Sequence, residues 1–175
     1  PRSTLFPYTT LFRSQNTLLN NQAIIFGEQG LVEKAKNNFW KATEGALAVG
    51  DTVLAFLGYN NVGYCYIELE KPDSARIYLD ASQAFMTSPR QTMERGLLHY
   101  NYGLVAKVEK NYTQAVEDFH RALFYSQDGA DALSTCRTFA KMGEVQFALS
   151  QYDSASYYLI RAERLAQQLE ANEVL

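Results

Sequence analysis

The sequence predicts an all-α protein in which about four helix–turn–helix units stack on one another, an arrangement called an α-solenoid. Two observations predict this fold. Apolar residues recur at helical spacing along the 175 residues, and small and large side chains recur every forty residues. The chain is 47% hydrophobic, which is enough for a core, and it has no run of about 18 apolar residues that could span a membrane.

Four columns of side chains define the forty-residue period. A small residue (Ala23, Gly63, Gly103, Gly143) is followed twelve positions later by alanine (Ala35, Ala75, Ala115, Ala155). A large apolar residue (Phe39, Leu79, Phe119, Leu159) and another small one (Ala42, Ser82, Ala122, Ala162) then follow at fixed spacing. The period predicts repeats at 16–55, 56–95, 96–135 and 136–175.

Each repeat is expected to contain two helices joined by a short turn. Gly30 separates the halves of repeat 1, and Pro72 suits the first turn of the second helix in repeat 2. Residues 109–111 divide repeat 3 and residues 150–151 divide repeat 4. Glycine facing alanine lets two antiparallel helices approach closely, so the small columns should mark the helix crossings.

The two ends differ from the repeats. Residues 4–14 resemble a translated reading frame through a sequencing-library adapter, so residues 1–14 are expected to be a non-native tail on a bacterial, metagenomic fragment. Residues 171–175 look like the start of a truncated fifth repeat. Localisation stays open because the native start is missing, although Cys65 and Cys136 are compatible with a reducing, cytoplasmic setting.

The columns of residues 16–175 resemble the tetratricopeptide repeat family. The similarity is carried by Gly63, Tyr66, Ala75, Leu79 and Ser82 in repeat 2 and by Gly103, Ala115, Phe119 and Ala122 in repeat 3. The period of 40 is longer than the family's usual length of about 34, and only Pro89 approximates its final proline. The longer period resembles the repeats of kinesin light chains and bacterial peptide-sensing regulators.

This resemblance implies a peptide-binding face on the first helix of each repeat. Asn21, Asn61 and Asn101 share one phase there, with Lys141 in the fourth repeat, and an asparagine amide can pair with a peptide group's N–H and C=O. Other candidates around them are Asn60, Tyr64, Tyr100, Lys107 and Arg137. In the alternative interpretation these side chains bond neighbouring helices or face water.

The sequence offers no pattern for catalysis, metal binding or a cofactor. His99 falls in a packing column and His120 on a second helix, and neither is spaced from a cysteine or carboxylate as in a triad or metal site. Trp40 is expected to pack within or between repeats. The net charge is −3, with no basic stripe, which argues against nucleic acid as a partner.

The sequence therefore predicts a non-catalytic scaffold whose concave face binds a protein or peptide. The alternative is the sensor portion of a larger bacterial transcription regulator or histidine kinase whose output domain lies outside the fragment. An enzyme is the third possibility. Because solenoid ends normally carry a polar cap, self-association through an uncapped end is also expected.

Overall fold

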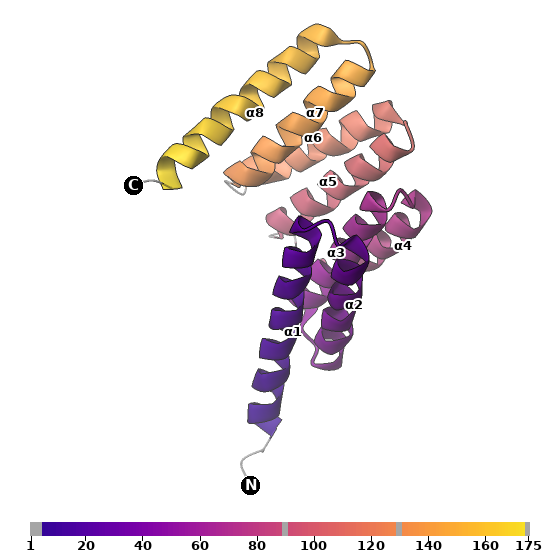
Figure 1. The fold of residues 1–175 in the computed structure, drawn as a ribbon, viewed down its shortest axis with the longest axis vertical. Helices are drawn as coiled ribbons and strands as arrows, with labels where there is room; N and C mark the ends of the chain where they lie inside the picture. Colours follow the sequence, from indigo (N-terminus) through magenta and orange to yellow (C-terminus); the bar gives the residue numbers. More distant parts are fainter. Residues whose placement is uncertain (1–4, 89–90, 129–130, 174–175) are drawn as a thin grey trace. The chain divides into compact units, whose positions relative to one another are not determined.

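The computed structural model describes residues 5–88, 91–128 and 131–173, and all regular elements within these ranges are α-helices. They are α1 (Leu5–Glu28), α2 (Val32–Ala48), α3 (Thr52–Glu68), α4 (Pro72–Gln83), α5 (Thr92–Val108), α6 (Tyr112–Asp128), α7 (Ala132–Ala148) and α8 (Tyr152–Glu173). They form two compact units, unit 1 from residues 1–87 and unit 2 from residues 88–175. The all-α prediction is confirmed (Figure 1).

Each unit contains two helix–turn–helix repeats. In unit 1, each helix packs on the next in the chain, and the first helices α1 and α3 also touch. Unit 2 has the same plan, with α5 and α7 as the first helices of its two repeats. Within the described residues, none of these helices is both long and apolar enough to cross a membrane.

One turn geometry recurs between the two helices of every repeat. Gly30, Glu70, Lys110 and Ser150 lie forty residues apart, and all have a positive φ, between 54° and 73°. In the first of these turns the Gly30 N–H donates to the Gly27 carbonyl and the Leu31 N–H to the Phe26 carbonyl. This paired pattern closes the C-terminus of a helix and recurs in the other three turns. The forty-residue period therefore extends to the backbone.

Aspartate side chains cap the starts of α3 and α7. Asp51 accepts a hydrogen bond from the Leu54 N–H at 3.1 Å, and Asp131 accepts one from the Ser134 N–H at 3.0 Å. Each carboxylate satisfies an amide that has no partner within its own helix. Pro72 is the first residue of α4, where its missing N–H costs no helical hydrogen bond, as expected.

In repeats 2, 3 and 4 the glycine column lies at the crossing of the two helices. A Cβ placed on Gly103 of α5 would lie 2.6 Å from the Phe119 ring of α6, and one on Gly143 would lie 2.6 Å from Leu159. Gly63 faces Leu79 in the same way, at 2.8 Å. The large apolar column thus occupies the space that the glycines leave empty, and the predicted role of these columns is confirmed.

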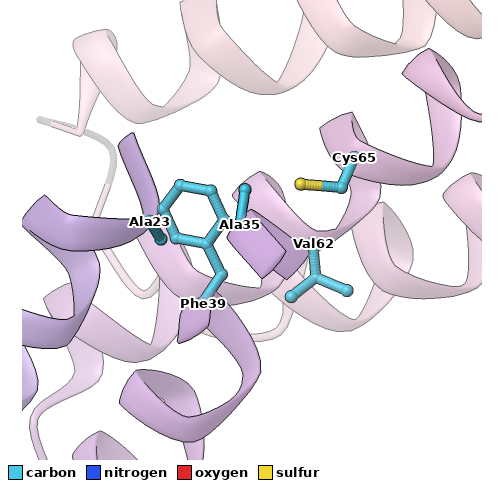
Figure 2. Packing of buried hydrophobic residues seen from close by; sticks show 5 residues of the cluster. All are labelled: Ala23, Ala35, Phe39, Val62 and Cys65. Atoms are coloured by element: carbon cyan, nitrogen blue, oxygen red, sulfur yellow. The ribbon is translucent and has the colours of Figure 1, made fainter. Parts of the chain in front are cut away.

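Repeat 1 solves the same packing problem with alanine. Figure 2 shows the Phe39 ring beside Ala23 and Ala35, with Val62 and Cys65 of α3 in the same cluster. All five side chains are buried. The second repeat therefore completes a core that the first repeat begins, as expected for stacked repeats.

An aromatic cluster joins the two repeats of unit 1. Trp40 of α2 makes edge-to-face contacts with Tyr59 at 6.0 Å and Tyr78 at 5.8 Å between ring centres. Tyr59 also stacks on Phe85, and Tyr78 stacks on Tyr66. Contacts of this kind add roughly 0.5–1.5 kcal/mol each beyond the area they bury. Trp40 is thus a packing residue between repeats, as predicted.

Both terminal helices extend beyond the repeat pattern. Helix α1 begins at Leu5, so the described part of the adapter-like stretch continues into the first helix without a break. The adapter origin of residues 1–14 stays a prediction. Residues 171–173 prolong α8 and form no separate helix, while the last two residues of the expected fifth repeat lie outside the described ranges.

The packing at the glycine crossing can be tested with one methyl group. Gly103→Ala should lower the free energy of unfolding by about 1–3 kcal/mol, because the new Cβ overlaps the Phe119 ring. Gly27→Ala is the matched control: nothing lies within 4 Å of its Cβ position, so alanine should leave stability unchanged or raise it slightly. Urea unfolding measures both, and equal midpoints for the two variants would contradict this packing.

Candidate functional site

The predicted peptide-binding residues are divided between the two units. Asn21 on α1 and Asn61 on α3 belong to unit 1, whereas Asn101 on α5 and Lys141 on α7 belong to unit 2. In unit 1, Asn21 is exposed and Asn61 is half-buried. The Asn61 amide donates to the side-chain oxygen of Asn20 on α1 at 3.5 Å. Asn61 thus makes the contact between neighbouring helices that was the alternative to peptide binding.

Two of the candidate asparagines need a correction. Asn60 is fully buried and Asn101 is 2% exposed, so neither presents its amide on the surface. Both amide atoms of Asn60 and the amide oxygen of Asn101 have no hydrogen-bond partner among the described residues. Both lie on first helices, as predicted, but the surrounding helices bury them. They cannot touch a ligand in this conformation.

Unit 2 brings four of the predicted residues onto one surface. Helices α5 and α7 touch, and they carry Tyr100 and Lys107 on the first and Arg137 and Lys141 on the second. Tyr100 is half-buried, with its ring 5.8 Å from that of Phe119, and Arg137 is exposed. We call this surface the α5–α7 face; it comprises Tyr100, Lys107, Arg137, Lys141 and Glu144.

Glu144 ties the two helices of this face together. Its carboxylate forms ion pairs with Lys107 of α5 and, at 2.8 Å, with Lys141 of α7. Partial burial raises the pKa of Glu144, but the hydrogen bonds and positive charges of the two lysines outweigh burial and hold the pKa below its usual value. At neutral pH the two lysine ammonium groups therefore share the single carboxylate of Glu144. The three side chains together keep a net charge of plus one.

A narrow cleft opens on the same unit where α5, α6 and α7 meet. Its volume is about 40 Å³, and its lining includes Tyr100, Arg137, Leu97, Met93 and Ser134. The space is too small for a drug-sized molecule. Tyr100 and Arg137 thus border a recess, which their sequence positions alone could not show.

His99 has a carboxylate partner that its sequence position did not suggest. Its Nδ1 lies 3.2 Å from Asp118 of α6, and its ring stacks on Tyr125 at 5.8 Å. Burial raises the pKa of Asp118, but hydrogen bonds from His99 and Gln114 and the charge of Arg121 outweigh it and keep the pKa below its usual range. This contact pairs His99 with a carboxylate of the next helix, and the pair has neither the spacing of a triad nor that of a metal site. His99 packs against Tyr125, as its place in a packing column predicts, and His120 on α6 is exposed.

The thiols fit a structural role. Burial raises the pKa of the Cys65 thiol to about 12, so it stays protonated and is a poor nucleophile at neutral pH. Cys136 donates to the Ala162 carbonyl at 3.3 Å, which links α7 to α8. In the ranges that the structure describes, no three His, Cys, Asp or Glu side chains gather in a group that could hold a metal ion.

Sequence reasoning missed a groove in the last repeat. An open groove of about 460 Å³ runs between α6, α7 and α8, and Arg161, Arg164, Tyr157 and Phe139 are among its lining residues. The signal was present in the sequence as two arginines one helical turn apart. It was missed because the expected binding face lay on first helices, whereas α8 is a second helix.

No family model matches the chain, and no curated protein sequence matches it. Solved structures do. BtubC (BKLC) from P. vanneervenii is 18% identical, with a TM-score of 0.69 over 89% of this chain and 64% of that one. Aspartyl phosphate phosphatase F from Bacillus subtilis is 13% identical, with a TM-score of 0.76 over 90% of this chain and 42% of that one.

Both neighbours are tetratricopeptide-like helical repeat proteins, so the chain has the tetratricopeptide-like fold that its columns indicate. At these identities the similarity establishes the fold alone. The chain spans less than two thirds of the length of either neighbour.

Acid titration tests the Glu144 cluster. Because the pKa of Glu144 is lowered in the folded protein, its contribution to stability is present above the usual pKa of 4.5 and is lost as pH falls through the lower folded value. Glu144→Gln should therefore cost about 0.2–1 kcal/mol at pH 7, as for a partly exposed ion pair, and progressively less below pH 4.5. The control is Glu117→Gln, which changes an exposed carboxylate on α6. Urea unfolding at several pH values gives the free energy of unfolding of each variant. The same pH dependence for both variants would contradict the Glu144 cluster.

Proposed function

We propose that the chain is a protein-interaction module that binds a peptide segment of another protein on the α5–α7 face of unit 2. One observation carries the proposal: two adjacent first helices place an aromatic ring and an exposed guanidinium at a small recess, and two lysines paired with Glu144 lie on the same helices. A rigid aromatic side chain supplies contact area, and the cationic groups supply directed hydrogen bonds.

In this proposal the bound segment is recognised but not chemically altered. Its mechanism is recognition by a preformed surface, in which Arg137 and the lysines bind carboxylate or carbonyl oxygens and Tyr100 packs against an apolar group. Preorganisation lowers the entropy cost of binding, because the Glu144 ion pairs already hold Lys107 and Lys141 in place. Asn21 and Tyr64 in unit 1 stay candidates for a separate contact, since both are exposed.

Two broader predictions stand beside this one. The chain could serve as the sensing part of a larger regulator, in which case the same face would bind an effector peptide. Self-association also stays a prediction; exposed Leu159 and Ile160 on α8 are the apolar side chains that a second copy would cover.

The α5–α7 face can be tested with peptides selected from a phage-displayed random library. Tyr100→Ala and Arg137→Ala should each weaken the selected peptides about two- to tenfold, which corresponds to the net contribution of one lost hydrogen bond or contact. The control is Lys41→Gln, which changes an exposed side chain on α2 of unit 1 and should leave affinity unchanged. Fluorescence anisotropy reads the affinities, and circular dichroism checks folding.

Two outcomes would count against the proposal. One is a failure of the library to yield any peptide that binds the wild-type chain. The other is a set of peptides whose affinity survives both Tyr100→Ala and Arg137→Ala.

A further inference from the structure

We infer a second binding site, in the groove between α7 and α8, that takes an extended peptide segment with acidic side chains at alternate positions. The groove has a volume of about 460 Å³ and lies entirely within unit 2. It is built on a second helix and shares no residue with the α5–α7 face. It does not depend on the function proposed for that face.

The Arg161 guanidinium is held ready for a ligand. It lies over the Phe139 ring at 4.7 Å and over the Tyr157 ring at 5.5 Å, and it donates to the Tyr157 hydroxyl at 2.7 Å. These three contacts restrain the guanidinium while the residue stays exposed. A fixed, exposed guanidinium loses little freedom on binding and suits the two oxygens of a carboxylate.

Arg164 adds a second positive charge one turn along α8. It is exposed and lines the groove, and no hydrogen bond or ion pair within the described part of the chain engages it. Successive residues of an α-helix are about 100° apart around its axis. Glu163 and Glu170 on the same helix therefore lie about 100° or more around the axis from each of the two arginines. Among the described residues that line the groove there is no carboxylate to neutralise the two arginines.

The arginine pair is not a requirement of the repeat fold. The equivalent positions hold Lys41 and Glu44 in repeat 1, Ala81 and Ala84 in repeat 2, and Arg121 and Phe124 in repeat 3. Three of the four repeats therefore form the same helix pair without two cations. The two arginines are available for a role other than folding.

The spacing of the arginines selects the form of the ligand. Residues three apart on a helix have Cβ atoms about 5–6 Å apart. In an extended peptide, side chains two residues apart point to the same side and are about 6.5–7 Å apart. Two acidic side chains at alternate positions can therefore reach both arginines at once, and the Gln168 amide in the same groove can bond the peptide backbone.

A pair of matched peptides tests the site. The probe is a fluorescein-labelled peptide in which glutamate alternates with alanine, and its partner replaces every glutamate with glutamine. The glutamate peptide should bind about tenfold or more tightly than the glutamine peptide, and its affinity should fall as salt rises. Equal binding of the two peptides, or no binding of the glutamate peptide, would overturn the inference.

Variants locate the binding on the protein. Arg164→Gln should weaken the glutamate peptide about fivefold or more, because it removes one charge-assisted contact without removing any internal one. Arg161→Lys should also weaken it, since lysine keeps the charge but not the planar fork. Lys41→Gln, which removes one positive charge from unit 1, should change affinity by less than about twofold.

Three results would contradict the site. Unchanged affinity in Arg164→Gln shows that the peptide binds elsewhere, as do NMR shift changes that avoid α7 and α8. Complete displacement of the peptide by inorganic phosphate, at matched ionic strength, shows a small-anion site instead. Circular dichroism confirms that each variant keeps its helices.

Discussion

The close contact between a glycine on a first helix and a large apolar side chain on the second sets the geometry of the repeats. Gly63, Gly103 and Gly143 leave just enough room for Leu79, Phe119 and Leu159. Because this contact brings the two helices together, the turn that joins them can be short. In every repeat a residue at the same position closes that turn in the left-handed (αL) conformation. Ala23 against Phe39 shows that the crossing also accepts a methyl group where the surrounding residues are adapted to it.

A crossing of this kind leaves each helix with sides that the hairpin does not use. On the first helices of unit 2 one such side carries Tyr100, Arg137 and the lysines paired with Glu144. On α8 another carries Arg161 and Arg164. Apart from Tyr100, whose ring lies against Phe119, the residues of these two surfaces take no part in the glycine crossings. Most of the side chains proposed for binding therefore lie outside the crossings that hold each repeat together.

Much of the fold could be predicted because the forty-residue period records both the crossings and the turns. The site was less predictable. Periodicity gives the direction of a side chain around its helix, but burial depends on neighbours from other helices, so Asn21, Asn61 and Asn101 share a phase and differ in exposure. The contact of His99 with Asp118 joins residues nineteen apart on two helices, and no short motif records it.

Hydrogen exchange of the free protein tests most directly whether the helix crossings are the centres of stability. Backbone amides of residues 60–66 and 75–82 in unit 1, and of 100–106 and 115–122 in unit 2, should exchange most slowly in their units. These segments hold the glycine crossings and buried side chains around them, so opening their amides requires cooperative unfolding. Protection that is uniform along the helices, or strongest at the turns, would contradict a fold that depends on the crossings.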